Sequence, residues 1–161
     1  MDLKSFKDEE IVGLYSDAIK ELKARNIIRT NNVVGDLGEF LAINIYNKTP
    51  GLPTLAYAPV GTQHIDAISR AGERYSIKST TTNTTGVFTG LNKKGDPKID
   101  KQVFEYVILC KFDGDFQLTA VYEIDWDTFM KHKKWHSTMG AWNLGLTRKL
   151  IEDAKIIYKR D

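Results

Sequence analysis

The chain has very little cysteine and no long apolar run. Its single cysteine, Cys110, excludes an internal disulfide, and its place inside the apolar run Val103–Phe112 predicts a buried thiol in a reducing, cytoplasmic setting. No apolar stretch approaches the roughly 20 residues that a membrane-spanning helix needs, and the first ten residues lack the apolar segment of a secretory signal. We therefore expect neither secretion nor a membrane partner.

A strong charge of either sign is missing too. The 23 basic and 21 acidic side chains leave a net charge of +2, so any basic surface that binds nucleic acid must be local. A hydrophobic content of 42% and a charged content of 27% are typical of globular proteins and exclude global disorder. The length predicts a single domain, residues 1–161.

Several catalytic signatures are absent as well. The chain has no Gly-x-Ser-x-Gly motif, no dinucleotide-binding or P-loop glycine pattern, no His-Glu-x-x-His sequence and no paired cysteines for zinc. The enzyme classes that depend on these signatures are therefore excluded.

Helical periodicity is present in the first third of the chain. Ser5 and Asp8 resemble a capping box, and apolar residues then recur at helical spacing up to about Arg25. A second helix is predicted over Val33–Lys48.

Two glycines stand near the start of this second helix. Gly35 and Gly38 lower its helix propensity, which predicts that another element or a ligand comes close to its first turns.

From residue 55 the apolar period changes to two, which predicts strands. The predicted strands are Leu55–Ala58, His64–Ser69, Glu73–Ser79, Val103–Phe112 and Phe116–Ile124, followed by short helices capped by Asp125 and Thr147 and a last strand at Lys155–Tyr158. This order predicts an α/β (α+β) fold with one mixed central β-sheet flanked by helices.

A long polar segment separates two of these strands. It covers residues 80–101, is rich in Thr, Asn, Gly and Lys, and has the length of loops that are functional or mobile. Hydroxyl, amide and ammonium groups donate to phosphate oxygens, which predicts a nucleic-acid-binding loop; on composition alone, an ordinary solvated loop is the alternative. The candidate contacts are Ser76, Thr80, Thr82, Lys93, Lys94 and Lys98.

The basic run Lys131–His136 is interpreted first as a solvated surface. Its lysines, with Trp135 and Trp142, could instead hold nucleic acid by charge and stacking.

An acid and a lysine lie on two predicted strands joined by a tight turn. If the turn centres on Ala71-Gly72, Asp66 lies opposite Ser76 and diagonal to Lys78, within reach of one shared ligand. An acid and a lysine together are what a divalent cation and a phosphodiester would need.

Glu39 is the best candidate for a second acid. It shares a largely apolar face of the second helix, where a buried carboxylate must be paired, protonated or metal-bound. Magnesium typically takes only one or two protein carboxylates and keeps several waters, so Asp66 and Glu39 would be a sufficient protein contribution.

Together these residues resemble the PD-(D/E)XK, restriction-endonuclease-like superfamily. Gly35-Asp-Leu-Gly-Glu39 is similar to its early-helix motif, and Tyr75-Ser-Ile-Lys78-Ser-Thr80 to its third motif. The resemblance covers roughly residues 33–80 and rests on short, degenerate motifs. It implies a mixed sheet flanked by helices, Mg²⁺-dependent hydrolysis of DNA, and dimerisation in many members.

Transferred by position, the resemblance assigns roles to individual residues. Asp66 and Glu39 would bind the metal, the Ile77 carbonyl would be a backbone ligand, and Lys78 would be the catalytic lysine. The expected function is a metal-dependent endodeoxyribonuclease of restriction or DNA-repair type, with Mg²⁺, or Mn²⁺ in its place, as cofactor. DNA is the expected partner, and sequence-specific recognition by so small a chain would need a homodimer or a partner subunit.

One position departs from the family pattern. Two residues before the lysine the family has Glu, Asp or Gln, whereas this chain has Ser76, a poor metal ligand. Either Glu39 supplies the missing charge, or His64 or Gln63 completes the site, or the site has lost its chemistry; Glu73 is on the opposite strand face. The alternatives are a catalytically inactive module that binds nucleic acid or protein, and an interaction protein with no nucleic-acid role.

Overall fold

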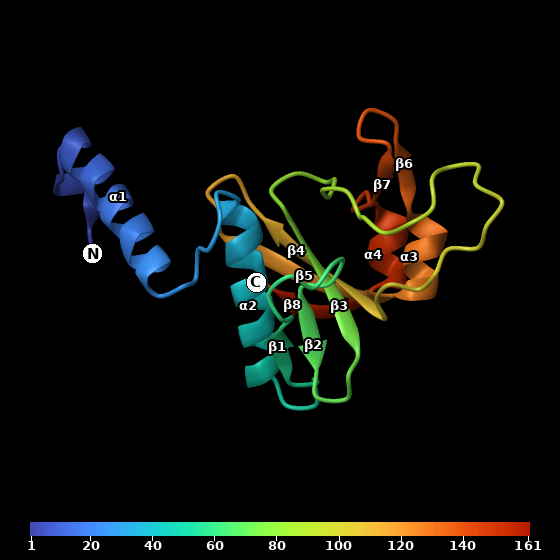
Figure 1. The fold of residues 1–161 in the computed structure, drawn as a ribbon. Coiled ribbons are helices and arrows are strands. Elements are labelled where there is room, and N and C mark those ends of the chain that lie inside the picture. Colours follow the sequence, from blue (N-terminus) through green and yellow to red (C-terminus); the bar gives the residue numbers. More distant parts are fainter.

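A six-stranded mixed sheet is the centre of the structure, a computed structural model that describes all residues from 1 to 161 (Figure 1). The strand order is β1-β2-β3-β4-β5-β8; β3 and β4 are parallel, and the other neighbouring pairs are antiparallel. The strands are β1 (Leu55–Tyr57), β2 (Ala67–Ser69), β3 (Arg74–Thr80), β4 (Tyr106–Phe112), β5 (Leu118–Asp125) and β8 (Lys155–Lys159). The predicted α/β (α+β) architecture, a mixed sheet flanked by helices, is confirmed.

Three strands begin two or more residues later than the sequence predicted: β4 begins at Tyr106 in place of Val103, and the other two late starts have a backbone cause. The second strand was expected from His64, but His64 has a φ of 68°, and β2 begins only at Ala67. Phe116 has a φ of 59°, and β5 begins at Leu118. A residue in the left-handed region interrupts an extended strand, which explains both differences.

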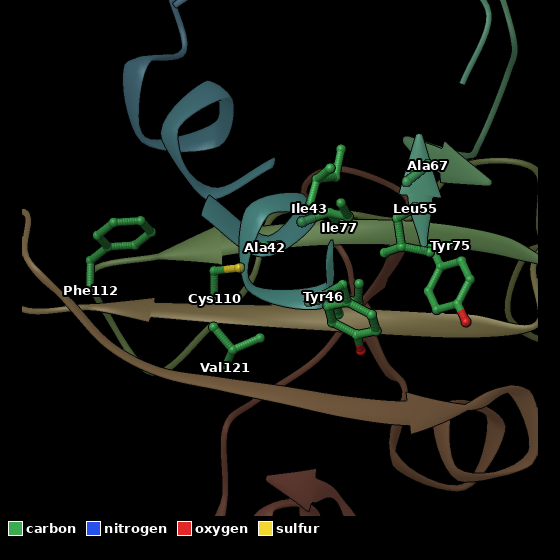
Figure 2. Close-up of a cluster of buried hydrophobic side chains, with 11 residues drawn as sticks. Ala42, Ile43, Tyr46, Leu55, Ala67, Tyr75, Ile77, Cys110, Phe112 and Val121 are labelled. Carbon is green, nitrogen blue, oxygen red and sulfur yellow. The ribbon is translucent and has the colours of Figure 1, made fainter. Parts of the chain in front are cut away.

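Helix α2 (Val33–Lys48) covers one face of the sheet and matches its predicted bounds. Its N-cap is Asn32, whose side chain accepts a hydrogen bond from the Gly35 N–H at 3.1 Å. Figure 2 shows its apolar side chains over those of β3, β4 and β5. The members of this core are Ala42, Ile43, Tyr46, Leu55, Ala67, Tyr75, Ile77, Ile108, Cys110, Phe112 and Val121. Each large side chain contributes about 1.5–3 kcal/mol by burial.

Gly38 sets the distance between α2 and β3. A Cβ atom at this position would lie 1.7 Å from the Ser79 Oγ and 3.5 Å from the Cys110 Cβ. The predicted close approach of another element is therefore confirmed for Gly38, and the neighbouring Glu39 is held beside the sheet. Cys110 is 1% exposed, and this burial raises the pKa of its thiol to about 12.

The opposite face of the sheet is covered by the C-terminal half of the chain. Helices α3 (Trp126–His132) and α4 (Arg148–Asp153) and the segment 81–105 pack here around an aromatic cluster. Phe104 lies in edge-to-face contact with Trp126 and Phe129, at ring distances of 5.2 and 5.1 Å. The other buried members are Phe88, Val107, Leu109, Ala120, Tyr122, Ile124, Leu144, Leu146 and Leu150.

A small hairpin was missed by the sequence analysis. Strands β6 (Lys134–His136) and β7 (Ala141–Asn143) pair in a separate two-stranded sheet. The interpretation of Lys131–His136 as a solvated surface is wrong for Lys133 and His132. The Lys133 side chain is 11% exposed and pairs with Asp100 at 2.6 Å, and the His132 side chain is 12% exposed and lies 2.7 Å from the Asp153 carboxylate.

Helix α1 (Asp8–Ala24) stands apart from the sheet (Figure 1) and buries none of its residues. The predicted capping box at Ser5 is displaced: the N-cap is Lys7, whose N–H donates to the Glu10 carboxylate at 2.7 Å. A short 3-10 turn, Leu3–Ser5, precedes it. No helix here combines the length and the apolar character needed to cross a membrane.

Candidate functional site

Asp66 immediately precedes β2 and is held by three hydrogen bonds. Its N–H donates to the Tyr75 carbonyl at 2.8 Å, and its carbonyl accepts from the Ala58 N–H at 2.9 Å. Its carboxylate Oδ2 accepts from the Ile77 N–H at 2.7 Å. The carboxylate is therefore fixed against the middle of β3, and its second oxygen has no protein partner within hydrogen-bond distance.

Asp66 and Lys78 line the same pocket. The β2–β3 ladder pairs Ala67 with Tyr75 and ends there, and the Asp66 N–H donates to the same Tyr75 carbonyl, so the predicted direct opposition of Asp66 and Ser76 is not formed although both line the pocket. The pocket has a volume of about 170 Å³. Its lining residues are Thr62, His64, Ile65, Asp66, Ser76, Lys78, Phe88, Thr89 and Phe104.

The ammonium group of Lys78 has no ion-pair partner. Its Nζ lies 5.0 Å from the centroid of the Phe88 ring, a cation–π contact that holds it beside the pocket. Ser76 is 3% exposed, so a small neutral side chain forms the wall next to Lys78. An uncompensated ammonium in a pocket with one fixed carboxylate is suited to an anionic ligand.

His64 connects the pocket to the long polar segment. Its Nδ1 lies 2.7 Å from the Thr89 Oγ1, and a Cβ atom at Gly90 would come within 2.9 Å of the imidazole ring. Gly90 also has a φ of 81°, so both its backbone conformation and the nearby imidazole ring require a glycine at this position. His64 is in the pocket, whereas Gln63 is exposed and is not among the lining residues.

Glu39 approaches Asp66 from α2. Its side chain is 20% exposed and forms an ion pair with the Arg29 guanidinium. Burial, followed by the negative charge of Asp66, raises the pKa of Glu39 to about 7, although Arg29 opposes the shift. The charge of Asp66 thus contributes to the raised pKa of Glu39, while Glu39 stays outside the lining of the Lys78 pocket.

The candidate metal ligands are all oxygen atoms. The Ile77 side chain is buried under α2, so Ile77 offers its backbone alone. Because the N–H and C=O of a strand residue point to the same side, its carbonyl is directed toward Asp66 as its N–H is. The structure has no group of three or more His, Cys, Asp or Glu side chains placed to hold a metal. Carboxylate and carbonyl oxygens are the kind of ligand that Mg²⁺ takes, with several waters kept.

The predicted loop contacts divide into two groups. Thr80 is buried, and its hydroxyl lies 2.8 Å from the Thr84 carbonyl and 3.1 Å from the Thr82 hydroxyl. These two hydroxyls bind each other and the loop backbone, so the structure gives them a role in loop shape. Lys93, Lys94 and Lys98 are exposed.

The exposed lysines are carried by a closed loop. The Asn92 N–H donates to the Asp100 carboxylate at 2.6 Å, and the Asn92 side-chain amide donates to the Lys98 carbonyl at 3.0 Å. Lys133 holds Asp100, and the Trp142 indole N–H donates to the Asn92 carbonyl at 2.7 Å. Residues 92–100 therefore project from a firm base.

Arg29 is the site residue that the sequence analysis missed. The buried Asp36 carboxylate accepts from the Arg29 N–H at 2.8 Å and the Thr30 N–H at 2.6 Å, and it lies 3.0 Å from the Thr30 hydroxyl. The guanidinium of Arg29 lies 4.3 Å from the Tyr57 ring centroid and pairs with Glu39. The sequence feature that could have pointed to Arg29 is Asp36, an acid in the first turn of α2 that lies seven residues after it.

No known family profile matches this chain, and no curated protein is similar to it in sequence. The resemblance to PD-(D/E)XK nucleases therefore depends on the short motifs and on the geometry of Glu39, Asp66 and Lys78.

Proposed function

We propose that the protein is a metal-dependent endodeoxyribonuclease of the PD-(D/E)XK type. One observation supports it most: Asp66 lies between an acid and a lysine from two other elements. Its charge acts on Glu39 of α2, and its pocket includes Lys78 of β3. These are the three side chains that the resemblance names, and they come from separate parts of the chain.

The residues divide the work of hydrolysis among them. Asp66, Glu39 and the Ile77 carbonyl would hold Mg²⁺ or Mn²⁺, which supplies charge neutralisation and activation of water when bound. Lys78 donates hydrogen bonds to the attacking water or to a non-bridging phosphate oxygen, where negative charge grows in the transition state. The hydrogen bond from the Ile77 N–H keeps the Asp66 carboxylate in one orientation.

The DNA backbone would pass over the pocket and the projecting lysines. Lys93, Lys94 and Lys98 would contact phosphates, Ser76 lines the pocket, and Thr80 and Thr82 shape the strand end and the loop. Reading of a base sequence would require a second copy or a partner subunit. The buried, unpaired Cys110 suits a cytoplasmic protein.

The test is cleavage of supercoiled plasmid DNA with Mg²⁺ or Mn²⁺. Asp66→Asn and Lys78→Ala should each lower the rate at least about 100-fold, because each removes a group that acts on the transition state. Glu39→Gln should lower it less if one carboxylate suffices. Exposed Glu152, on α4, provides the control Glu152→Gln, which should cleave normally. Cleavage that survives both Asp66→Asn and Lys78→Ala would reject the site.

A nucleic-acid-binding module without catalysis is the second candidate. The neutral Ser76 beside Lys78 and the pairing of Glu39 with Arg29 favour it, because both reduce the charge available to a metal. It predicts DNA binding at low salt with no cleavage in either metal.

A further inference from the structure

A basic groove lies at the linker that joins α1 to α2. We name it the junction groove and define it by its lining residues. These residues are Lys23, Asn26, Ile28, Arg29, Thr30 and Asn31, around a volume of about 710 Å³. A neighbouring hollow of about 270 Å³ shares Lys23, Thr30 and Asn31 and adds Lys20. No acidic side chain lines either one.

The groove has cations that are available to a ligand. Lys23 has no ion-pair partner, whereas Lys20 is paired with Asp17 on its own helix. Arg29 donates only one hydrogen bond to Glu39, through Nη2, and its side chain is 38% exposed. Since a guanidinium has five N–H donors, most of its donor capacity remains free for a phosphate.

The wall of the groove is held in place. Ile28 is 2% exposed, and the buried Asp36 carboxylate takes up the backbone N–H groups of Arg29 and Thr30. Asp36 is 4% exposed, and its carboxylate does not line the groove. Arg29 is therefore presented from a fixed backbone, and Lys23 from the last turn of α1.

We propose that the junction groove binds phosphates of the DNA backbone and that Arg29 connects this contact to the Glu39–Asp66 site. This inference rests on DNA being the substrate. In Figure 1 the α1–α2 linker and the projecting loop of residues 92–100 lie on opposite sides of β2 and β3. A DNA duplex that touches both would extend across the β2 and β3 region.

The experiment measures binding of a fluorescently labelled DNA duplex without divalent cations, across a range of salt concentrations. Lys23→Ala and Arg29→Ala should each weaken binding and reduce the slope of log K against log salt by about 0.9, the value for one phosphate contact. Arg29→Lys should recover most of the slope. Lys159→Ala, an exposed and unpaired lysine on β8, should leave the slope unchanged. Circular dichroism confirms that each variant is folded.

The same measurement is repeated in Glu39→Gln. If Arg29 only neutralises Glu39, Arg29→Ala has no further effect in that background, and the proposal is overturned. If Arg29 binds phosphate, the loss of slope persists. If the wild-type protein cleaves DNA but Lys23→Ala and Arg29→Ala leave the salt slope unchanged, the groove is rejected and the nuclease stands. If the two variants change the slope but the wild-type protein does not cleave, the nuclease is rejected and the groove stands. If the wild-type protein does not bind DNA even at low salt, both proposals are rejected.

Discussion

The two faces of the central sheet are built in different ways. One face is covered by α2, a single regular helix whose apolar residues recur at helical spacing. The other is covered by short helices, a small hairpin and the irregular segment 81–105. Asp66 lies between them: Glu39 approaches it from the first face, and the aromatic rings of the second face border its pocket.

The difference teaches where single interactions matter. The α2 face depends on many similar apolar contacts, so the loss of one is shared among neighbours. The other face packs around its aromatic cluster and adds polar anchors, of which the buried pair of Asp100 and Lys133 is the clearest. Breaking one such anchor should therefore cost more than a comparable change under α2.

Asp100→Asn tests that expectation and should have the largest effect on stability. It leaves the buried Lys133 ammonium without its counter-charge, which should lower the free energy of unfolding by about 3–5 kcal/mol. Chemical denaturation measures this. The exposed Asp96, on the same loop, provides the control Asp96→Asn, which should change stability by less than about 1 kcal/mol. Equal effects at both positions would contradict the anchor.

Gly38→Ala tests the α2 face and should have an intermediate effect. The added methyl group meets the Ser79 Oγ, so α2 must move away from β3 at a cost of about 1–3 kcal/mol. Gly13→Ala, where a Cβ atom meets nothing, should stabilise α1 by up to about 1 kcal/mol. Thermal unfolding of the two variants should show shifts of opposite sign. Gly38→Ala should also cleave plasmid DNA more slowly, because Glu39 moves with the helix.

The pH dependence of stability should show the smallest effect, and it concerns the place where the faces meet. The pKa of Glu39 is raised from 4.5 to about 7 in the folded protein, so the folded state holds its proton more tightly. The contribution of Glu39 to stability is therefore fully present below pH 4.5 and is lost as the pH rises to about 7. Glu39→Gln should remove this part of the slope. An unchanged profile in Glu39→Gln would show that burial and Asp66 do not act on this carboxylate.

The α2 face was predictable because its information is local. The bounds of α2 follow from its apolar period, and the pairing of β2 with β3 follows from one tight turn. The other face was not predictable, because its partners are far apart in sequence. The Lys133–Asp100 pair and the Trp142–Asn92 hydrogen bond each join residues that no periodicity connects.

The same contrast applies inside the site. Asp66, Lys78 and Glu39 were found from motifs, and their positions relative to each other follow from strand alternation and helix packing. Arg29 follows from neither, because it lies in an irregular linker whose shape depends on the buried Asp36. Its contact with Glu39 therefore became visible only in three dimensions.

The parallel pairing of β3 with β4 has a consequence for how the protein folds. Lys78 pairs with Leu109, and the segment 81–105 lies between their strands. The chain must therefore lose the entropy of closing a long loop before the hydrogen bonds of this ladder can form. The hairpin of β2 and β3 and the hairpin of β4 and β5 need only local closure. We expect these hairpins to form early and the β3–β4 seam to join late, so that the pocket wall from Phe88 and Phe104 is completed in the last stage of folding.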